Sequence, residues 1–135
     1  MTLVEEIAWL LDELGVATFD PETPAGNQVF IGRLPESPDT AIAIARYSGV
    51  EAPIGHYDEP QIQFRVRGPA TDARVAQNLA QAVYDAMHGL GTRYLAGGTW
   101  LQLAVGTQSG PIDIGQDEHG RPELTINVRL DVSRP

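Results

Sequence analysis

Apolar residues near the N-terminus recur at the spacing of an amphipathic helix. They are Leu3, Val4, Ile7, Leu10, Leu11 and Leu14. At ~100° per residue their side chains fall within an arc of about 120°, which suits a helix laid on a sheet. Thr2 and Glu5 have the spacing of a capping box, and Gly15 is a typical stop signal. The pattern therefore predicts a helix over residues 3–14. Its polar side would hold Glu5, Glu6, Trp9, Asp12 and Glu13.

A second helical pattern lies in the middle of the chain. Thr71 or Asp72 is the expected cap, and Gly89 and Gly91 end the helix after about His88. The apolar side is broad and includes four small residues, which allow a helix to approach a sheet closely: Ala76, Ala80, Ala82 and Ala86. Beside them lie Val75, Leu79, Val83, Met87 and Leu90.

The other apolar positions alternate with polar ones, which is typical of half-buried strands. The clearest alternation covers residues 61–67, where the apolar Ile62, Phe64 and Val66 would face the core and their neighbours are polar. Further strands are expected at residues 28–34, 41–47, 99–106, 112–115 and 123–132. The last two flank the turn sequence 116–122 and should form a hairpin. Segments rich in Gly, Pro and Thr are expected to be loops: residues 15–27, 48–60 and 92–98.

The order of elements predicts an α+β fold. A largely antiparallel sheet would carry both helices on one face and end in a C-terminal β-hairpin. A chain of 135 residues supports one ordinary core, so we expect a single domain over residues 1–135. The predicted core is Leu10, Leu14, Phe64, Val66, Leu79, Val83, Ile126, Val128 and Leu130.

The amino-acid composition argues against several classes of function. Nine Arg, no Lys and 18 acids give a net charge of −9, and the first 60 residues account for all of it, with 11 acids against Arg33 and Arg46. Such a protein repels duplex DNA, so ordinary nucleic-acid binding is disfavoured. The absence of Cys excludes thiol catalysis and thiolate metal sites. Apolar stretches are too short to cross a bilayer, and acids replace the bases of a signal peptide, so we expect a soluble protein with no membrane partner.

The sequence nominates no catalytic, cofactor or metal site. His56, His88 and His119 are more than 30 residues apart. A metal site would need Asp58 and Glu59 beside His56, or Asp117 and Glu118 beside His119, and such short clusters in turns are usually solvated. The glycine pairs follow a helix instead of preceding one, so they lack the helix N-terminus that holds phosphate. A small metal-assisted hydrolase using His56, Asp58 and Glu59 is the alternative from another class.

Two features suggest an interface. The outward row Gln61, Gln63, Arg65 and Arg67 is either a solvated strand face or a contact surface, because Arg is enriched in interfaces. Trp9 lies among carboxylates, so it either folds over a neighbouring loop or docks on another chain, and we expect the second. The inferred interface residues are Trp9, Gln61, Gln63, Arg65, Arg67, Asp117, Glu118, Arg121 and Arg129.

Several short segments together resemble a known family. They are Leu34-Pro35-Glu36-Ser37-Pro38-Asp39, Ile42-Ala43-Ile44, Gln61-Ile62-Gln63-Phe64-Arg65-Val66-Arg67-Gly68, Ala86-Met87-His88-Gly89-Leu90, Gly110-Pro111-Ile112 and Gly120-Arg121-Pro122-Glu123-Leu124-Thr125-Ile126-Asn127. In this order and spacing, which extends over about residues 3–132, they resemble the minor capsid or tail terminator proteins of tailed bacteriophages.

The resemblance implies a structural virion protein that is not an enzyme and has no cofactor. Such proteins form a ring, typically a hexamer, that caps the finished tail tube and joins the tail to the head. The implied partners are further copies of the chain, the tail tube protein and a head-tail connector or stopper protein, with genomic DNA passing through the ring without specific binding. The implied place is the neck of the virion, after assembly in the host cytoplasm. Another head-tail joining or head completion protein is the nearest alternative.

Overall fold

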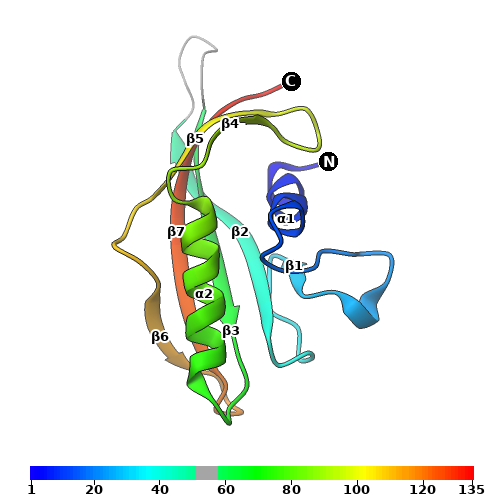
Figure 1. The fold of residues 1–135 in the computed structure, drawn as a ribbon, viewed down its shortest axis with the longest axis vertical. Coiled ribbons are helices and arrows are strands. Elements are labelled where there is room, and N and C mark those ends of the chain that lie inside the picture. Colours follow the sequence, from blue (N-terminus) through cyan, green and yellow to red (C-terminus); the bar gives the residue numbers. More distant parts are fainter. Residues whose placement is uncertain (51–57) are drawn as a thin grey trace.

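Two helices lie on one face of a curled sheet in the computed structural model, which describes residues 1–50 and 58–135 (Figure 1). The helices are α1 (Leu3–Glu13), the short 3-10 helix η1 (Pro24–Gly26) and α2 (Ala73–Met87). The strands are β1 (Val29–Ile31), β2 (Ala41–Val50), β3 (Glu59–Arg67), β4 (Gly91–Tyr94), β5 (Trp100–Gly106), β6 (Ile112–Gln116) and β7 (Pro122–Ser133). The α+β class with a C-terminal hairpin is confirmed.

The long strand β7 organises the sheet. The strand order is β1-β2-β3-β7-β5-β4, and the sheet curls into a half-barrel. One side of β7 pairs with β3, whereas its other side pairs with β6 near its start and with β5 near its end. All these pairs are antiparallel, and among the described strands only β1 runs parallel to its neighbour β2. The largely antiparallel prediction is therefore confirmed, with one parallel edge strand that the sequence did not indicate.

Both helices begin and end where the sequence signals predicted. The Thr2 hydroxyl accepts a hydrogen bond from the Glu5 amide at 3.3 Å, and Gly15 follows the helix with a φ of +75°. Asp72, and not Thr71, caps α2 by accepting from the Arg74 amide at 3.0 Å. Gly89 then takes a φ of +81°, which is costly for residues with a Cβ, so the chain turns there.

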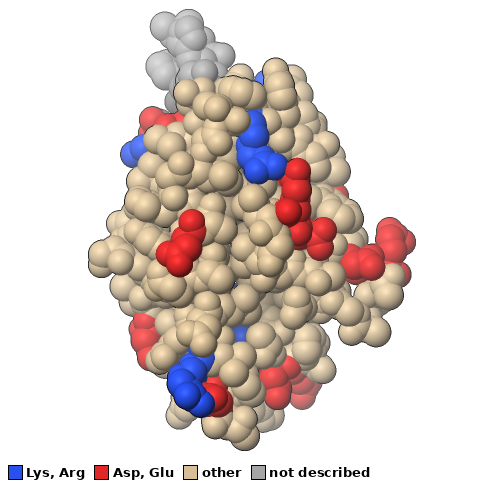
Figure 2. Space-filling model, viewed as in Figure 1, with Lys and Arg blue, Asp and Glu red and all other residues tan. Residues whose placement is uncertain are grey.

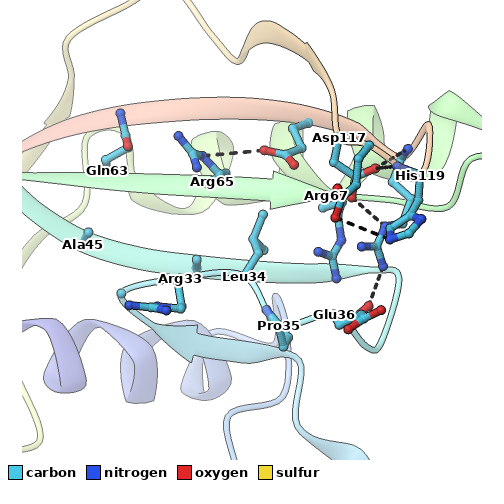
Figure 3. A pocket seen from close by; sticks show the side chains of 15 residues that line it. Arg33, Leu34, Pro35, Glu36, Ala45, Gln63, Arg65, Arg67, Asp117 and His119 are labelled. Atoms are coloured by element: carbon cyan, nitrogen blue, oxygen red, sulfur yellow. Dashed lines mark hydrogen bonds and ion pairs between the residues drawn. The ribbon is translucent and has the colours of Figure 1, made fainter.

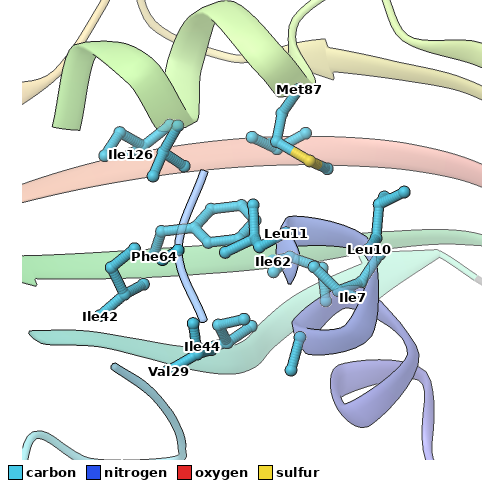
Figure 4. Packing of buried hydrophobic residues seen from close by; sticks show 14 of the residues in the cluster. Ile7, Leu10, Leu11, Val29, Ile42, Ile44, Ile62, Phe64, Met87 and Ile126 are labelled. Carbon is cyan, nitrogen blue, oxygen red and sulfur yellow. The ribbon is translucent and has the colours of Figure 1, made fainter. Parts of the chain in front are cut away.

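The core lies between the helices and the sheet (Figure 4). Of the nine predicted core residues, seven are buried, while Leu14 and Leu79 are partly buried and pack against the cluster. Phe19 and Leu95 also belong to it, although they lie in segments that the sequence analysis treated as loops. A loop that carries one large apolar side chain can cover the open end of a core, and periodicity does not detect such a residue.

The structure corrects several boundaries. Strand β1 covers only Val29–Ile31 of the predicted 28–34, because its pairing with β2 stops there. Strands β2 and β3 extend to Val50 and from Glu59, into the predicted loop 48–60. Strand β4 covers Gly91–Tyr94, within the predicted loop 92–98 and the glycine before it, because this segment pairs with β5.

The position of Glu6 also differs from the prediction, because the helical pattern assigned it to the solvated side of the helix. Its side chain is buried, and it accepts hydrogen bonds from the Gly97 amide at 2.8 Å, the Thr99 amide at 3.3 Å and the Thr99 hydroxyl at 2.6 Å. The carboxylate therefore joins α1 to the connection between β4 and β5. A Cβ at position 97 would lie 2.9 Å from the Glu6 carboxylate, so the glycine leaves room for this contact.

Candidate functional site

In the part of the chain that the structure describes, one face of the sheet carries no helix, and the predicted polar row lies on it. In β3 the side chains of Ile62, Phe64 and Val66 are buried toward the helices, so the alternate residues point to the other side. The strand register places their neighbours in β2 and β7 beside them. We call this surface the open face; it consists of Ala41, Ala43, Ala45, Gln61, Gln63, Arg65, Arg67, Glu123, Thr125, Asn127 and Arg129.

A hollow of about 520 Å³ lies on the open face (Figure 3). Its floor comes from β2, β3 and β7, and its walls come from residues 32–36 after β1 and from the turn between β6 and β7. Six of the predicted interface residues line it: Gln63, Arg65, Arg67, Asp117, Glu118 and Arg121. Gln61 and Arg129 form a register pair farther along the same face, whereas Trp9 lies on α1, on the other side of the sheet.

Two of these arginines are buried and form hydrogen bonds within their own chain. Arg67 is 3% exposed and donates to the carbonyl oxygens of Asp39 at 2.9 Å and Pro38 at 2.6 Å. Arg121 is 7% exposed and donates to the Asp117 carboxylate at 2.7 Å and to the Glu36 carbonyl oxygen at 2.5 Å. These bonds fix the connection between β1 and β2 against the end of β3 and the β6–β7 turn. We therefore do not retain Arg67 and Arg121 as contact residues.

Asp117 organises the turn between β6 and β7. Its carboxylate accepts from the amides of His119 and Arg121, both at 2.9 Å, as well as from the Arg121 guanidinium. Burial raises the pKa of Asp117, but these hydrogen bonds outweigh burial and lower the pKa to about 2. Burial, together with the nearby charge of Arg121, lowers the pKa of Arg67. Asp117 is thus an internal partner of the turn, whereas the neighbouring Glu118 side chain is 86% exposed.

Two other arginines of the open face are accessible, whereas Thr125 is buried. The Arg65 side chain is 51% exposed and its Nε lies 3.7 Å from the Glu123 carboxylate. The Arg129 side chain is 42% exposed, with its Nε 3.6 Å from Asp131. At such distances neither contact holds the guanidinium in a hydrogen bond. Between them, Gln63 donates to Asn127 at 3.2 Å.

Arg33 is a site residue that sequence reasoning missed. It is exposed and lines the hollow from the segment after β1. No hydrogen bond or ion pair joins its side chain to any described residue. Its one signal in the sequence is that only two Arg occur among the first 60 residues.

Trp9 packs within its own chain. Its ring meets Phe19 edge to face, with centroids 4.9 Å apart, and it is partly buried against the core. This arrangement is the first of the two alternatives, in which the ring folds over a neighbouring loop. Burial of its remaining surface by another chain stays a prediction.

The described residues offer little for metal chemistry. Within residues 1–50 and 58–135, no group of three His, Asp or Glu side chains is placed to hold a metal ion. His56, the centre of the hydrolase alternative, lies outside the described residues, and Asp58 forms an ion pair with Arg134 at 2.7 Å. The Nδ1 atom of His88 accepts a hydrogen bond from the Gly106 amide at 3.0 Å, and its ring stacks on Tyr84. In the described part of the chain, neither helix is long and apolar enough to span a membrane.

Comparisons with known proteins assign this architecture to a family. A structure titled "Virion of native gene transfer agent (GTA) particle" contains a chain of the same fold, with a TM-score of 0.66 and 17% sequence identity over 99% of this chain and 100% of that one. A search of curated protein sequences finds no match. The family model described as bacteriophage tail terminator protein matches residues 10–134. The chain therefore belongs to the bacteriophage tail terminator protein family, and it is a structural, non-enzymatic component of the tail of a phage-like virion.

Proposed function

We propose that this tail terminator forms a ring at the head-proximal end of the tail, caps the tail tube there and joins the tail to the head. The observation that carries the proposal is the family match over residues 10–134. A similar fold, found end to end in a chain from a virion, supports it. Six copies are the expected stoichiometry. The partners are the tail tube protein on one side and a head-tail connector or stopper protein on the other, after assembly in the host cytoplasm.

We also propose that residues 1–135 act as one domain in that ring. Both helices and strands β1, β2, β3, β5 and β7 contribute buried side chains to a single hydrophobic cluster, which supports this proposal. Genomic DNA would pass through the lumen without a specific binding site. The net charge of −9 favours passage, because a wall that carries few accessible cations cannot hold a polyanion.

Removal of the gene from a particle-producing genome tests this function. The proposal predicts tail tubes of uneven and excessive length that are not joined to filled heads, as seen by electron microscopy. A plasmid-borne copy of the gene should restore tailed particles. Tubes of normal length beside leaking or unjoined heads would contradict the cap and would favour a head completion protein instead.

A further inference from the structure

The hollow on the open face differs in charge from the rest of the molecule. Four Arg and four acids line it, so its formal charge is zero on a chain of −9. The remaining surface therefore carries the whole net negative charge. The four acids are Glu36, Asp117, Glu118 and Glu123, and the four cations are Arg33, Arg65, Arg67 and Arg121.

Two of these cations are available to a partner. Arg67 and Arg121 are buried and bonded to their own chain, as shown above. Arg33 is exposed without an ionic partner among the described residues, and half of the Arg65 side chain is exposed. Both lie at the hollow (Figure 3), where Leu34, Pro35 and the alanines of β2 add apolar surface. Arginine beside apolar surface is typical of the centre of a protein interface.

A second surface carries the opposite charge. Acidic residues gather on α1 and on the loop that follows it, which lie on the right in Figure 1, and red groups occupy the same region in Figure 2. We call this surface the acidic edge; it consists of Glu5, Asp12, Glu13, Asp20 and Glu22. Among the described residues Arg93 is the one cation bonded to it, through Glu13 at 2.9 Å. The helix α1 covers the opposite side of the sheet from the open face.

We propose that the open face of one copy binds the acidic edge of a second copy. Copies with a charge of −9 repel each other, so they associate best where a surface of one is neutral or basic. Contact between two acidic edges would instead bring like charges together. Because the two complementary surfaces lie on opposite sides of one chain, the contact is head to tail, and repetition of such a contact closes a ring when the rotation fits. This inference rests on the ring of the proposed function and assigns its subunit contact.

Charge reversal at two residues that line the hollow, Arg33 and Arg65, provides the first arm of the test. The double variant R33E/R65E should raise the concentration required for assembly by about tenfold or more, measured by light scattering after size exclusion. The matched control is R46E/R74E, which changes the net charge equally at two exposed residues away from the open face. Circular dichroism should show both variants folded, because all four side chains are exposed.

Mixing provides the second arm. The acidic-edge variant E5R/E22R should also fail to assemble alone, because its basic edge then meets the exposed cations Arg33 and Arg65. Mixed with R33E/R65E, it should form rings in which the two variants alternate, since each contact then joins opposite charges. A variant that had merely lost its fold would not recover on mixing.

The outcomes separate this inference from the function. A parent protein that stays monomeric at every concentration overturns both the contact and the ring. If the parent forms rings and R33E/R65E assembles as well as R46E/R74E, the contact is overturned while the ring stands. Assembly lost in both variants and not restored by mixing shows that the two surfaces do not meet each other.

Discussion

Arg67 and Arg121 show how single residues determine the shape of the open face. Two neighbouring guanidinium groups tolerate burial here because carbonyl oxygens of residues 36–39 and the Asp117 carboxylate accept their hydrogen bonds. The alternation in β3 predicted the side of the sheet to which Arg67 points. It did not predict these bonds, since their acceptors come from a segment almost 30 residues away.

The pKa of Asp117 predicts how the protein responds to acid. Because the pKa in the folded state lies at about 2, below the ordinary 3.8, the hydrogen bonds of Asp117 stabilise the fold above about pH 4. This contribution should be lost as the pH falls toward 2. The variant D117N should be less stable at pH 7 and lose less stability between pH 4 and 2, as measured by urea titration. E118Q is the matched control, and equal pH dependence in parent and D117N would contradict the assignment.

Glu6 gives a second prediction at this scale. In E6A, the amides of Gly97 and Thr99 and the Thr99 hydroxyl lose their acceptor inside the protein. A buried donor that is left without an acceptor costs about 1 to 3 kcal/mol. We therefore expect E6A to lower the free energy of unfolding by on the order of 3 kcal/mol. The neighbouring substitution E5A should cost much less, because no hydrogen bond from its side chain to a described residue is present. Equal losses in the two variants would show that the Glu6 contacts contribute little.

At the scale of elements, the sequence predicts the segments that carry a local signal of their own. It does not predict features that arise only from pairing with a neighbouring strand. Helices α1 and α2 and the β6–β7 hairpin carry local signals, namely caps, alternation and a turn sequence. Strand β4 and the parallel pairing of β1 depend on a neighbouring strand, which a local pattern does not contain. The hollow was unpredictable for the same reason, because it is assembled from the segments after β1 and β6 and from strands β2, β3 and β7.

Truncation of core residues tests how the elements face each other. Ile126 on β7 is 1% exposed, so I126A should destabilise the fold by about 2 to 5 kcal/mol. Leu79 on α2 is only partly buried, so L79A should cost clearly less than I126A. Denaturant titration of both variants measures the difference. A larger loss for L79A would contradict the packing of α2 on the sheet.

For the whole molecule, the net charge leads to a prediction about which side chains line the lumen of the proposed ring. Six copies of a −9 chain would carry −54, but screening over ~8 Å means that only charges at the wall act on the DNA. The sequence predicts that some acids of residues 1–60, or Asp117 and Glu118, face the lumen. Because Asp117 is bonded within its turn, and Glu118 and the acidic edge lie at the proposed subunit contact, we expect other acids of residues 1–60 there. The exposed Arg65 and Arg129 should be turned toward neighbouring subunits or partners, whereas Arg67 is bonded within its own chain. In a map of the ring, a lumen lined by these arginines would contradict the prediction even with the ring present.

The position and number of copies in the particle decide whether this protein closes the tail. Cryo-electron microscopy of purified particles at the head–tail junction measures both, because the fold of residues 1–50 and 58–135 can be placed in the density. We predict one ring of six copies on the last tube layer, in contact with the connector or stopper above it. A junction without this fold, or copies of the chain distributed along the tube, would contradict its function as the ring that terminates the tail.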